Sequence, residues 1–112
     1  MYEASYQLHL MGAATSSAPS PAWVDYLRQQ TAQVPGVKQA VDRIAAPAGS
    51  EDATLMMARV QERGGLASYM IFGTELSAGH HNEKFDFDES VMTQAVATLA
   101  RIAMNFPWQR GV

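Results

Sequence analysis

Ionisable residues are concentrated in one stretch that shows no regular spacing, residues 73–87, and just beyond it. They are Glu75, His80, His81, Glu83, Lys84, Asp86, Asp88 and Glu89. The chain has no cysteine, so a zinc site would have to use imidazole and carboxylate ligands. Adjacent histidines in extended backbone point to opposite sides, so we expect one to bind a metal and the other to face elsewhere. A His-His pair in a polar loop is also typical of plain solvated surface, and the residues alone leave both interpretations open.

The position of this loop favours function. It follows residues 66–72, a short apolar run typical of a strand that is buried on both faces. Open α/β sheets bind ligands at the carboxyl ends of such strands, and loops this long in compact domains are usually functional or disordered. Within the loop, Phe85 and Phe87 alternate with Asp86 and Asp88, so we expect the two phenyl rings to anchor it.

A first helix is predicted before the apolar run. Ser20 as N-cap and Pro21 at the first helical position predict a helix to about Gln33, and the Val-Pro-Gly sequence at 34–36 ends it. Its apolar stripe consists of Trp23, Val24, Leu27 and Val34. In residues 37–44 the apolar side chains have helical spacing, but the segment is short and follows a turn, so a short strand is slightly preferred.

A second helix is predicted to begin at Ser50, with Glu51 and Asp52 in its first turn, and to end at Gly64 and Gly65. The side chains predicted to point inward are Leu55, Met56 and Val60. The two acidic residues complement the helix dipole, which explains them without any function, although they could also form an acid and base pair in a cleft.

Asp88 is predicted to cap a third helix, which Pro107 ends. Its buried stripe is predicted to consist of Val91, Ala95, Leu99, Ile102 and Phe106. Helices that alternate with strands predict an α/β fold with a partial open sheet and helical crossovers. Residues 2–10 differ, because their polar and apolar alternation belongs to an antiparallel sheet with one wet face.

Composition excludes several classes of partner. The net charge is −3 and no basic cluster is present, which argues against nucleic acid. No apolar run approaches the roughly 20 residues that a transmembrane helix needs, so we expect no membrane partner. The first residues do not resemble a secretory signal, and we expect a cytoplasmic protein.

Three blocks of residues resemble a known family. Residues 49–54, residues 73–74 and residues 79–89 resemble the closing third of the metal-dependent amidohydrolases and carboxypeptidases, which include aminoacylases, hippurate hydrolases and auxin-conjugate hydrolases. The likeness is greatest to the branch of aminobenzoyl-glutamate hydrolase A subunits. It implies hydrolysis of the amide bond of an acyl-amino acid such as aminobenzoyl-glutamate.

The resemblance also implies a site. Members of this family hold two metal ions, zinc or manganese, whose bridging water attacks the amide carbonyl while a glutamate acts as general base. Their last metal ligand is a histidine four residues before an aromatic residue, and His81 with Phe85 has that spacing. The resemblance places His80 beside the site, as a substrate contact or a support of the ligands. Glu51 and Asp52 match a motif near the cleft.

The family pattern further implies that residues 1–12 end a lid domain used for dimerisation, and that residues 13–112 form the carboxyl-terminal part of the catalytic domain. Nothing in the sequence matches the other metal ligands or the general base. We therefore expect the chain to be inactive alone and to bind metal only when the amino-terminal portion of the same enzyme supplies the other ligands. The alternative is a non-catalytic α/β module, or a truncated remnant, that stands alone and self-associates through an exposed sheet edge and its helix faces.

Overall fold

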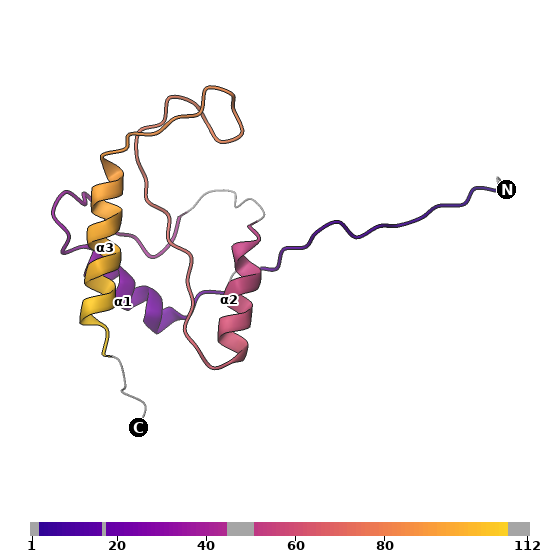
Figure 1. The fold of residues 1–112 in the computed structure, drawn as a ribbon. Coiled ribbons are helices and arrows are strands. Elements are labelled where there is room, and N and C mark those ends of the chain that lie inside the picture. The colour runs from indigo at the N-terminus through magenta and orange to yellow at the C-terminus, as the bar shows by residue number, and fades with distance from the viewer. Residues whose placement is uncertain (1–2, 17, 45–50, 108–112) are drawn as a thin grey trace.

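The computed structural model describes residues 3–16, 18–44 and 51–107, and it contains three helices within these ranges: α1 (Pro21–Thr31), α2 (Ala53–Glu62) and α3 (Val91–Asn105). Figure 1 shows α1 beside α3, with α2 further along the molecule and the amino-terminal segment extending away from the helices. None of the helices in these ranges is long and apolar enough to cross a bilayer.

Helix α1 begins as predicted, with Ser20 as N-cap and proline at the first position, although the Ser20 side chain makes no capping hydrogen bond. It ends at Thr31, two residues before the predicted end. The reason is a tightening of the chain, in which the backbone N–H of Val34 donates to the carbonyl of Thr31 at 3.0 Å and Gly36 follows with φ 88°. Leu27 and Val34 are buried as predicted, and Trp23 and Val24 are half-buried.

The core of the described structure lies between α1 and α3. The Trp23 ring stacks on Tyr26 with centroids 5.3 Å apart, and the edge of Phe106 meets Trp23 at 5.1 Å and Tyr26 at 5.6 Å. The Tyr26 hydroxyl donates to the carbonyl of Ile102 at 2.9 Å. Edge-to-face and offset aromatic contacts of this kind stabilise a fold beyond their buried area, so this cluster fixes the two helices relative to each other.

The predicted buried stripe of α3 is wrong in part. Ile102 is buried, but Leu99 is 55% exposed, and the most deeply buried residue is Thr98. The reason is that α1 covers the side of α3 that carries Thr98 and Ile102, one step around the helix from Leu99. The cap also differs from the prediction, because Ser90 is the N-cap while the Asp88 carboxylate accepts the Ser90 backbone N–H at 2.9 Å.

Helix α2 has Asp52 as its N-cap; the predicted cap Ser50 lies outside the described residues. The helix ends before Gly64, which has φ 79° as expected for a left-handed terminator. The inward side predicted for α2 is wrong, since Thr54 and Met57 are buried and the exposed residues include Leu55, Met56 and Val60. The segment before α1 sets the packed face instead: the backbone N–H of Thr15 donates to the Thr54 hydroxyl at 3.2 Å.

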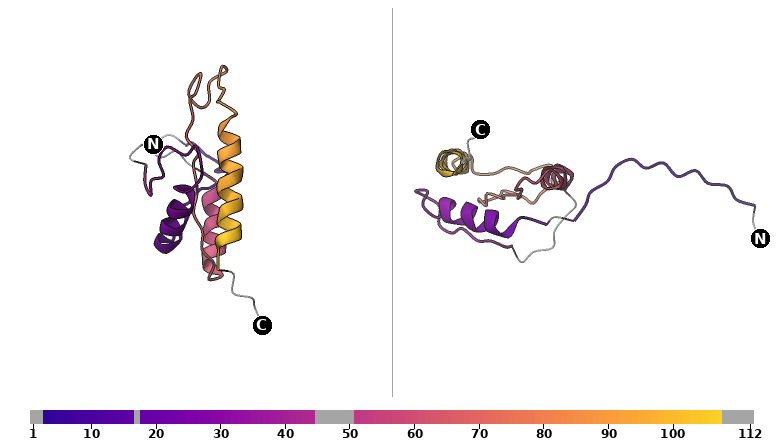
Figure 2. Two further views of the ribbon diagram at one scale, coloured as in Figure 1. Left: turned by 90° about the vertical axis from the view of Figure 1, so that its left-hand side faces the viewer. Right: turned by 90° about the horizontal axis from the view of Figure 1, so that it is seen from below.

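The segments predicted as strands are not paired. Within the described ranges, residues 3–10, 37–44 and 66–72 form no strand, and the single ladder contact is an isolated antiparallel bridge between Leu76 and Phe87. Residues 66–72 run between α2 and the pair formed by α1 and α3 (Figures 1 and 2). Ala67 is buried there, but Ile71 is 65% exposed, so the segment is not buried on both faces within the described structure. The α/β class remains a prediction.

Candidate functional site

The loop that holds the histidines is a hairpin of residues 74–88. Its base is the bridge between Leu76 and Phe87, which is extended on one side by the backbone N–H of Ser77 donating to the carbonyl of Asp86 at 3.2 Å. On the other side the N–H of Asp88 donates to the carbonyl of Glu75 at 3.3 Å. Figure 1 shows this hairpin projecting beyond the amino-terminal end of α3, where it stands clear of the three helices.

Side chains cross-link the tip of the hairpin. The Asn82 side-chain oxygen accepts the backbone N–H of Lys84 at 2.9 Å, and the Asn82 carbonyl accepts the N–H of Phe85 at 3.0 Å. Across the hairpin, the Ser77 hydroxyl donates to the carbonyl of Lys84 at 2.7 Å. Asparagine favours such turns because its short side chain can bond the backbone two residues on. The tip therefore has a defined conformation even though it is exposed.

The two histidines have different surroundings. His81 has φ 61°, a left-handed conformation that is uncommon outside glycine, so the predicted extended pair is wrong and the backbone turns between the two rings. The His80 ring stacks on Phe85, with centroids 5.1 Å apart and planes 28° apart. The His81 side chain is exposed and makes no hydrogen bond to any other described residue. The histidine with the family spacing, His81, is thus the one in a left-handed conformation, while His80 is the one held in a ring stack.

The carboxylates of the hairpin do not gather around His81. No group of three or more His, Asp or Glu side chains that could hold a metal ion occurs in the part of the chain that the structure describes. Asp88 serves α3 instead, and the backbone N–H and the side chain of Ser90 lower the pKa of its carboxyl by hydrogen bonding. The hairpin alone therefore presents two exposed imidazoles, of which the His80 ring is stacked on Phe85, and no cluster of ligands.

Glu51 and Asp52 lie at the start of α2, and Glu51 is engaged in hydrogen bonds. Its carboxylate accepts the backbone N–H of Ala53 at 3.2 Å and the hydroxyl of Tyr69 at 3.0 Å. These contacts lower the pKa of Glu51 below its ordinary value of 4.5, the Ala53 bond most strongly, and the same carboxylate raises the pKa of Tyr69. The helix therefore uses Glu51 as a structural acceptor at its first turn.

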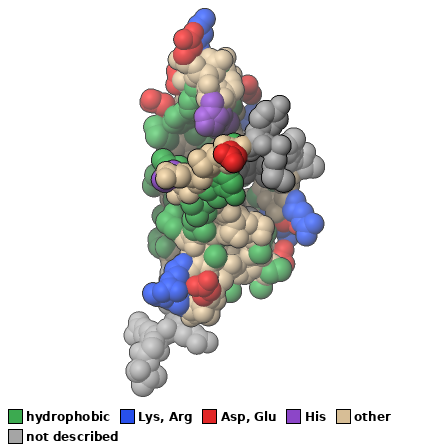
Figure 3. All heavy atoms as spheres, turned by 90° about the vertical axis from the view of Figure 1, so that its right-hand side faces the viewer, with side chains coloured by type: hydrophobic (Ala, Val, Ile, Leu, Met, Phe, Trp, Pro, Cys, Tyr) green, Lys and Arg blue, Asp and Glu red, His purple; other side chains and the backbone are tan. Residues whose placement is uncertain are grey.

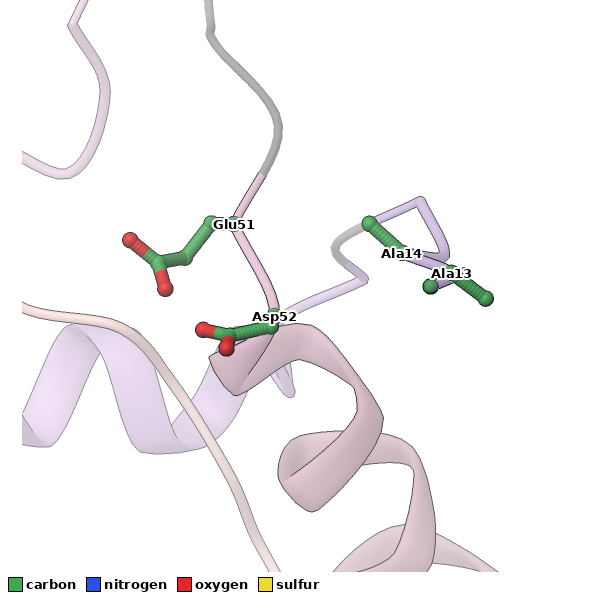
Figure 4. A pocket seen from close by; sticks show the side chains of 5 residues that line it. Ala13, Ala14, Glu51 and Asp52 are labelled. Atoms are coloured by element: carbon green, nitrogen blue, oxygen red, sulfur yellow. The ribbon is translucent and has the colours of Figure 1, made fainter. Parts of the chain in front are cut away.

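Neither His80 nor His81 lines either of two concave regions found in the described structure. An open depression is lined by residues 12–14, Glu51 and Asp52. Figure 4 shows the two carboxylates pointing to the same side, away from Ala13 and Ala14. A larger groove of about 870 Å³ runs between α1, residues 36–44 and residues 68–75 and reaches the start of α3.

One residue of the Glu51 group, Tyr69, is not among the predicted site residues. Tyr69 stands in the apolar run at 66–72, where its spacing does not distinguish it from its neighbours. A hydroxyl-bearing ring at one position of an apolar segment is a signal for a specific hydrogen bond, but the sequence gives no indication that Glu51 is its acceptor. Phe85 contacts both His80 and, at 6.5 Å between centroids, Phe87, but both phenyl rings are exposed, so the expected anchoring of the loop by these rings stays a prediction.

Comparison with known proteins identifies relatives over the whole chain. The indole-3-acetyl-aspartic acid hydrolase of Enterobacter agglomerans is 80% identical over all 112 residues, which correspond to 26% of that protein. The A subunit of p-aminobenzoyl-glutamate hydrolase from Escherichia coli (strain K12) is 66% identical over the same length, again 26% of the relative. The crystal structure of an aminobenzoyl-glutamate utilization protein from Klebsiella pneumoniae is similar with a TM-score of 0.78 and 74% identity, covering 99% of this chain and 25% of that one.

The chain thus spans about a quarter of the length of these relatives. The family model for peptidase family M20/M25/M40 matches residues 3–105. That range includes the hairpin, both histidines and the start of α2, which are the features on which the resemblance in the sequence was based. The chain belongs to peptidase family M20/M25/M40.

Proposed function

We propose that this chain is the carboxyl-terminal part of a metal-dependent amidohydrolase, and that it supplies His81 to the metal centre of that enzyme. The observation that carries the proposal is the state of His81. Its imidazole is exposed and unbonded among the described residues, and it is borne by a left-handed residue at the cross-linked tip of a hairpin. A left-handed non-glycine residue persists only where its surroundings over-determine it, and such residues cluster at functional sites.

The imidazole of His81 is a suitable ligand for zinc or manganese, although it supplies a single donor. A neutral imidazole is a good ligand for either ion, but the described residues provide no further cluster to complete a site. A complete structural zinc site is worth roughly 10–16 kcal/mol, so one ligand of four contributes about 3–4 kcal/mol, which corresponds to millimolar affinity. We therefore expect the chain alone to be empty and inactive, with the other ligands and the general base supplied by the remainder of the enzyme.

The substrate class follows from the names of the relatives. One is a hydrolase of indole-3-acetyl-aspartic acid and another of p-aminobenzoyl-glutamate, and both compounds join an aromatic acyl group to an acidic amino acid. We infer the same class for the enzyme that contains this chain. A bound metal ion would polarise the amide carbonyl and generate a nucleophile from water near neutral pH. Action in the cytoplasm is part of this proposal.

Exposed apolar surface supports a role within a larger protein. Val96 and Leu99 on α3, Met56 on α2 and Ile71 in the extended segment are all more than half exposed. Figure 3 shows hydrophobic side chains reaching the surface over much of the middle of one face. Large apolar side chains gathered at an exposed surface mark an interaction site, and we propose that the remainder of the enzyme covers them. The same surface could serve self-association of a non-catalytic module, which is the alternative.

The test of the metal role uses the full-length enzyme that contains these residues. Hydrolysis of p-aminobenzoyl-glutamate and indole-3-acetyl-aspartate is measured for the unaltered protein, for His81→Ala and for the control His9→Ala, a histidine in the exposed amino-terminal segment. We expect His81→Ala to lower kcat/KM by more than about 100-fold, since even groups that only support a metal ligand contribute roughly 10–100-fold. Unchanged turnover in His81→Ala would refute the assignment.

The alternative is tested on the chain by itself. Size-exclusion chromatography with and without zinc, and with the amino-terminal portion added, separates the two functions. A soluble aggregate that the amino-terminal portion converts to a defined complex supports the enzyme. A discrete oligomer that ignores both zinc and the amino-terminal portion supports the non-catalytic module.

A further inference from the structure

We propose that His80 and Phe85 are positioning residues whose ring stack holds the hairpin tip in the conformation that presents His81. The inference rests on the proposed function in one respect, namely that His81 is a metal ligand. It assigns His80 a task through its ring face, distinct from a contact with substrate. The juxtaposition that carries it is a ring pair that closes the chain on both sides of His81.

The stack bridges the hairpin tip. His80 directly precedes the left-handed residue, while Phe85 lies four residues after it, at the start of the returning segment. Their centroids are 5.1 Å apart with planes 28° apart, which is an offset stacked arrangement. Phe85 is 40% exposed and also meets Phe87. The pair is thus tied to the base of the hairpin, because Phe87 forms the bridge with Leu76.

The hydrogen bonds of the tip do not reach His80. Those of Asn82 to Lys84 and Phe85 fix residues that follow His81, and that of Ser77 to Lys84 crosses the hairpin from a residue three positions before His80. Among the described residues, the contact that fixes the residue preceding His81 is the ring stack. A left-handed conformation at a non-glycine residue persists where the surrounding contacts over-determine it. The stack therefore completes the constraint on the direction of the His81 side chain.

Loss of the stack should leave the hairpin folded at its base but free at its tip. A metal ligand that must be ordered upon binding weakens affinity relative to a preorganised one, and groups that orient ligands typically contribute 10–100-fold. The effect depends on ring faces and not on the imidazole nitrogens of His80. His80→Phe should therefore preserve the stack with Phe85.

The experiment titrates Co²⁺ into the metal-free full-length enzyme and records both the affinity and the visible absorption bands of the bound ion. We expect Phe85→Leu and His80→Ala each to weaken Co²⁺ binding by about 10-fold and to alter the absorption bands, with the double variant no weaker than either single one. His80→Phe and Phe85→Tyr keep two stacked rings and should retain the original affinity and bands. Phe106→Leu removes a ring of the α1 and α3 cluster and should change neither.

A second measurement avoids dependence on metal. Hydrogen exchange of the Phe85 backbone N–H in the metal-free enzyme should quicken in Phe85→Leu and His80→Ala but not in His80→Phe. Unchanged affinity, bands and exchange in both disrupting variants would overturn the role of the stack, as would a His80→Phe variant as weak as His80→Ala. If His81→Ala alone abolishes binding while the stack variants bind normally, the proposed function survives without this inference. If His81→Ala keeps full Co²⁺ affinity, both fall.

Discussion

Replacing either of two buried threonines by valine should change the free energy of unfolding, but in opposite directions. Thr98 on α3 has 0% exposure, and its hydroxyl oxygen makes no hydrogen bond within the described structure. Thr54 on α2 has 6% exposure, and its hydroxyl donates to the Glu51 carbonyl at 2.6 Å while accepting the Thr15 N–H at 3.2 Å. Valine has nearly the same shape as threonine without the hydroxyl, so Thr98→Val and Thr54→Val isolate the hydrogen-bonding part of each site.

The magnitudes follow from the cost of an unpaired buried polar group. Removing the unsatisfied hydroxyl of Thr98 should raise the free energy of unfolding by about 1–2 kcal/mol. Thr54→Val should lower it by about 1–3 kcal/mol, because two hydrogen bonds are lost and the Thr15 N–H and the Glu51 carbonyl lose this partner. Thr93→Val, at an exposed threonine of the same helix α3, should stay within about 0.5 kcal/mol.

Urea unfolding monitored by tryptophan fluorescence measures these differences. With a denaturant slope of about 1.5 kcal/mol per molar, Thr98→Val should move the midpoint upward by about 1 M. Destabilisation by Thr98→Val comparable to that by Thr54→Val would refute the reasoning, since it would mean that the Thr98 hydroxyl is paired in the folded state.

Three further outcomes follow from single contacts. The lowered pKa of Glu51 adds stability that is present above its ordinary pKa of 4.5 and is lost as the pH falls through the pKa of the folded state. Glu51→Gln should therefore flatten the fall in the free energy of unfolding below about pH 5. An unchanged pH profile in this variant would contradict the assignment. Gly64→Ala places a side chain at φ 79° with no neighbour within 4 Å and should cost about 1 kcal/mol in urea unfolding, whereas Gly73→Ala, in equally open space without a left-handed φ, should cost nothing. Tyr26→Phe removes the 2.9 Å bond to Ile102 and should lower the free energy of unfolding by about 1 kcal/mol, which would appear as a lower thermal midpoint. An unaltered midpoint would show that the bond contributes nothing.

Local signals in the sequence predicted the helices well. Ser20 with Pro21 located the start of α1, and Gly64 located the end of α2, because capping and left-handed termination depend on a few adjacent residues. The buried faces were predicted less well. Leu55 and Leu99 have helical spacing with other apolar residues, yet both are exposed, since an apolar stripe shows that some partner exists and not which element of the described structure provides it.

Strand pairing was predicted less well for a related reason. A strand in a sheet needs paired neighbours for its backbone groups, whereas in residues 66–72 the Ala67 carbonyl accepts the Ser20 N–H at 3.2 Å and no strand of the described residues pairs with the segment. At the site, the spacing of His81 and Phe85 located the exposed imidazole. The stack of His80 on Phe85 and the bond from Tyr69 to Glu51 were outside the reach of sequence reasoning, because both depend on turns that bring distant residues together.

Metal binding by His81 can be observed by anomalous X-ray diffraction at the zinc edge, from crystals of the full-length enzyme with bound zinc. We expect an anomalous peak about 2.0–2.1 Å from a ring nitrogen of His81, with the remaining ligands contributed by parts of the enzyme outside this chain. A zinc peak whose ligands do not include His81 would contradict this expectation.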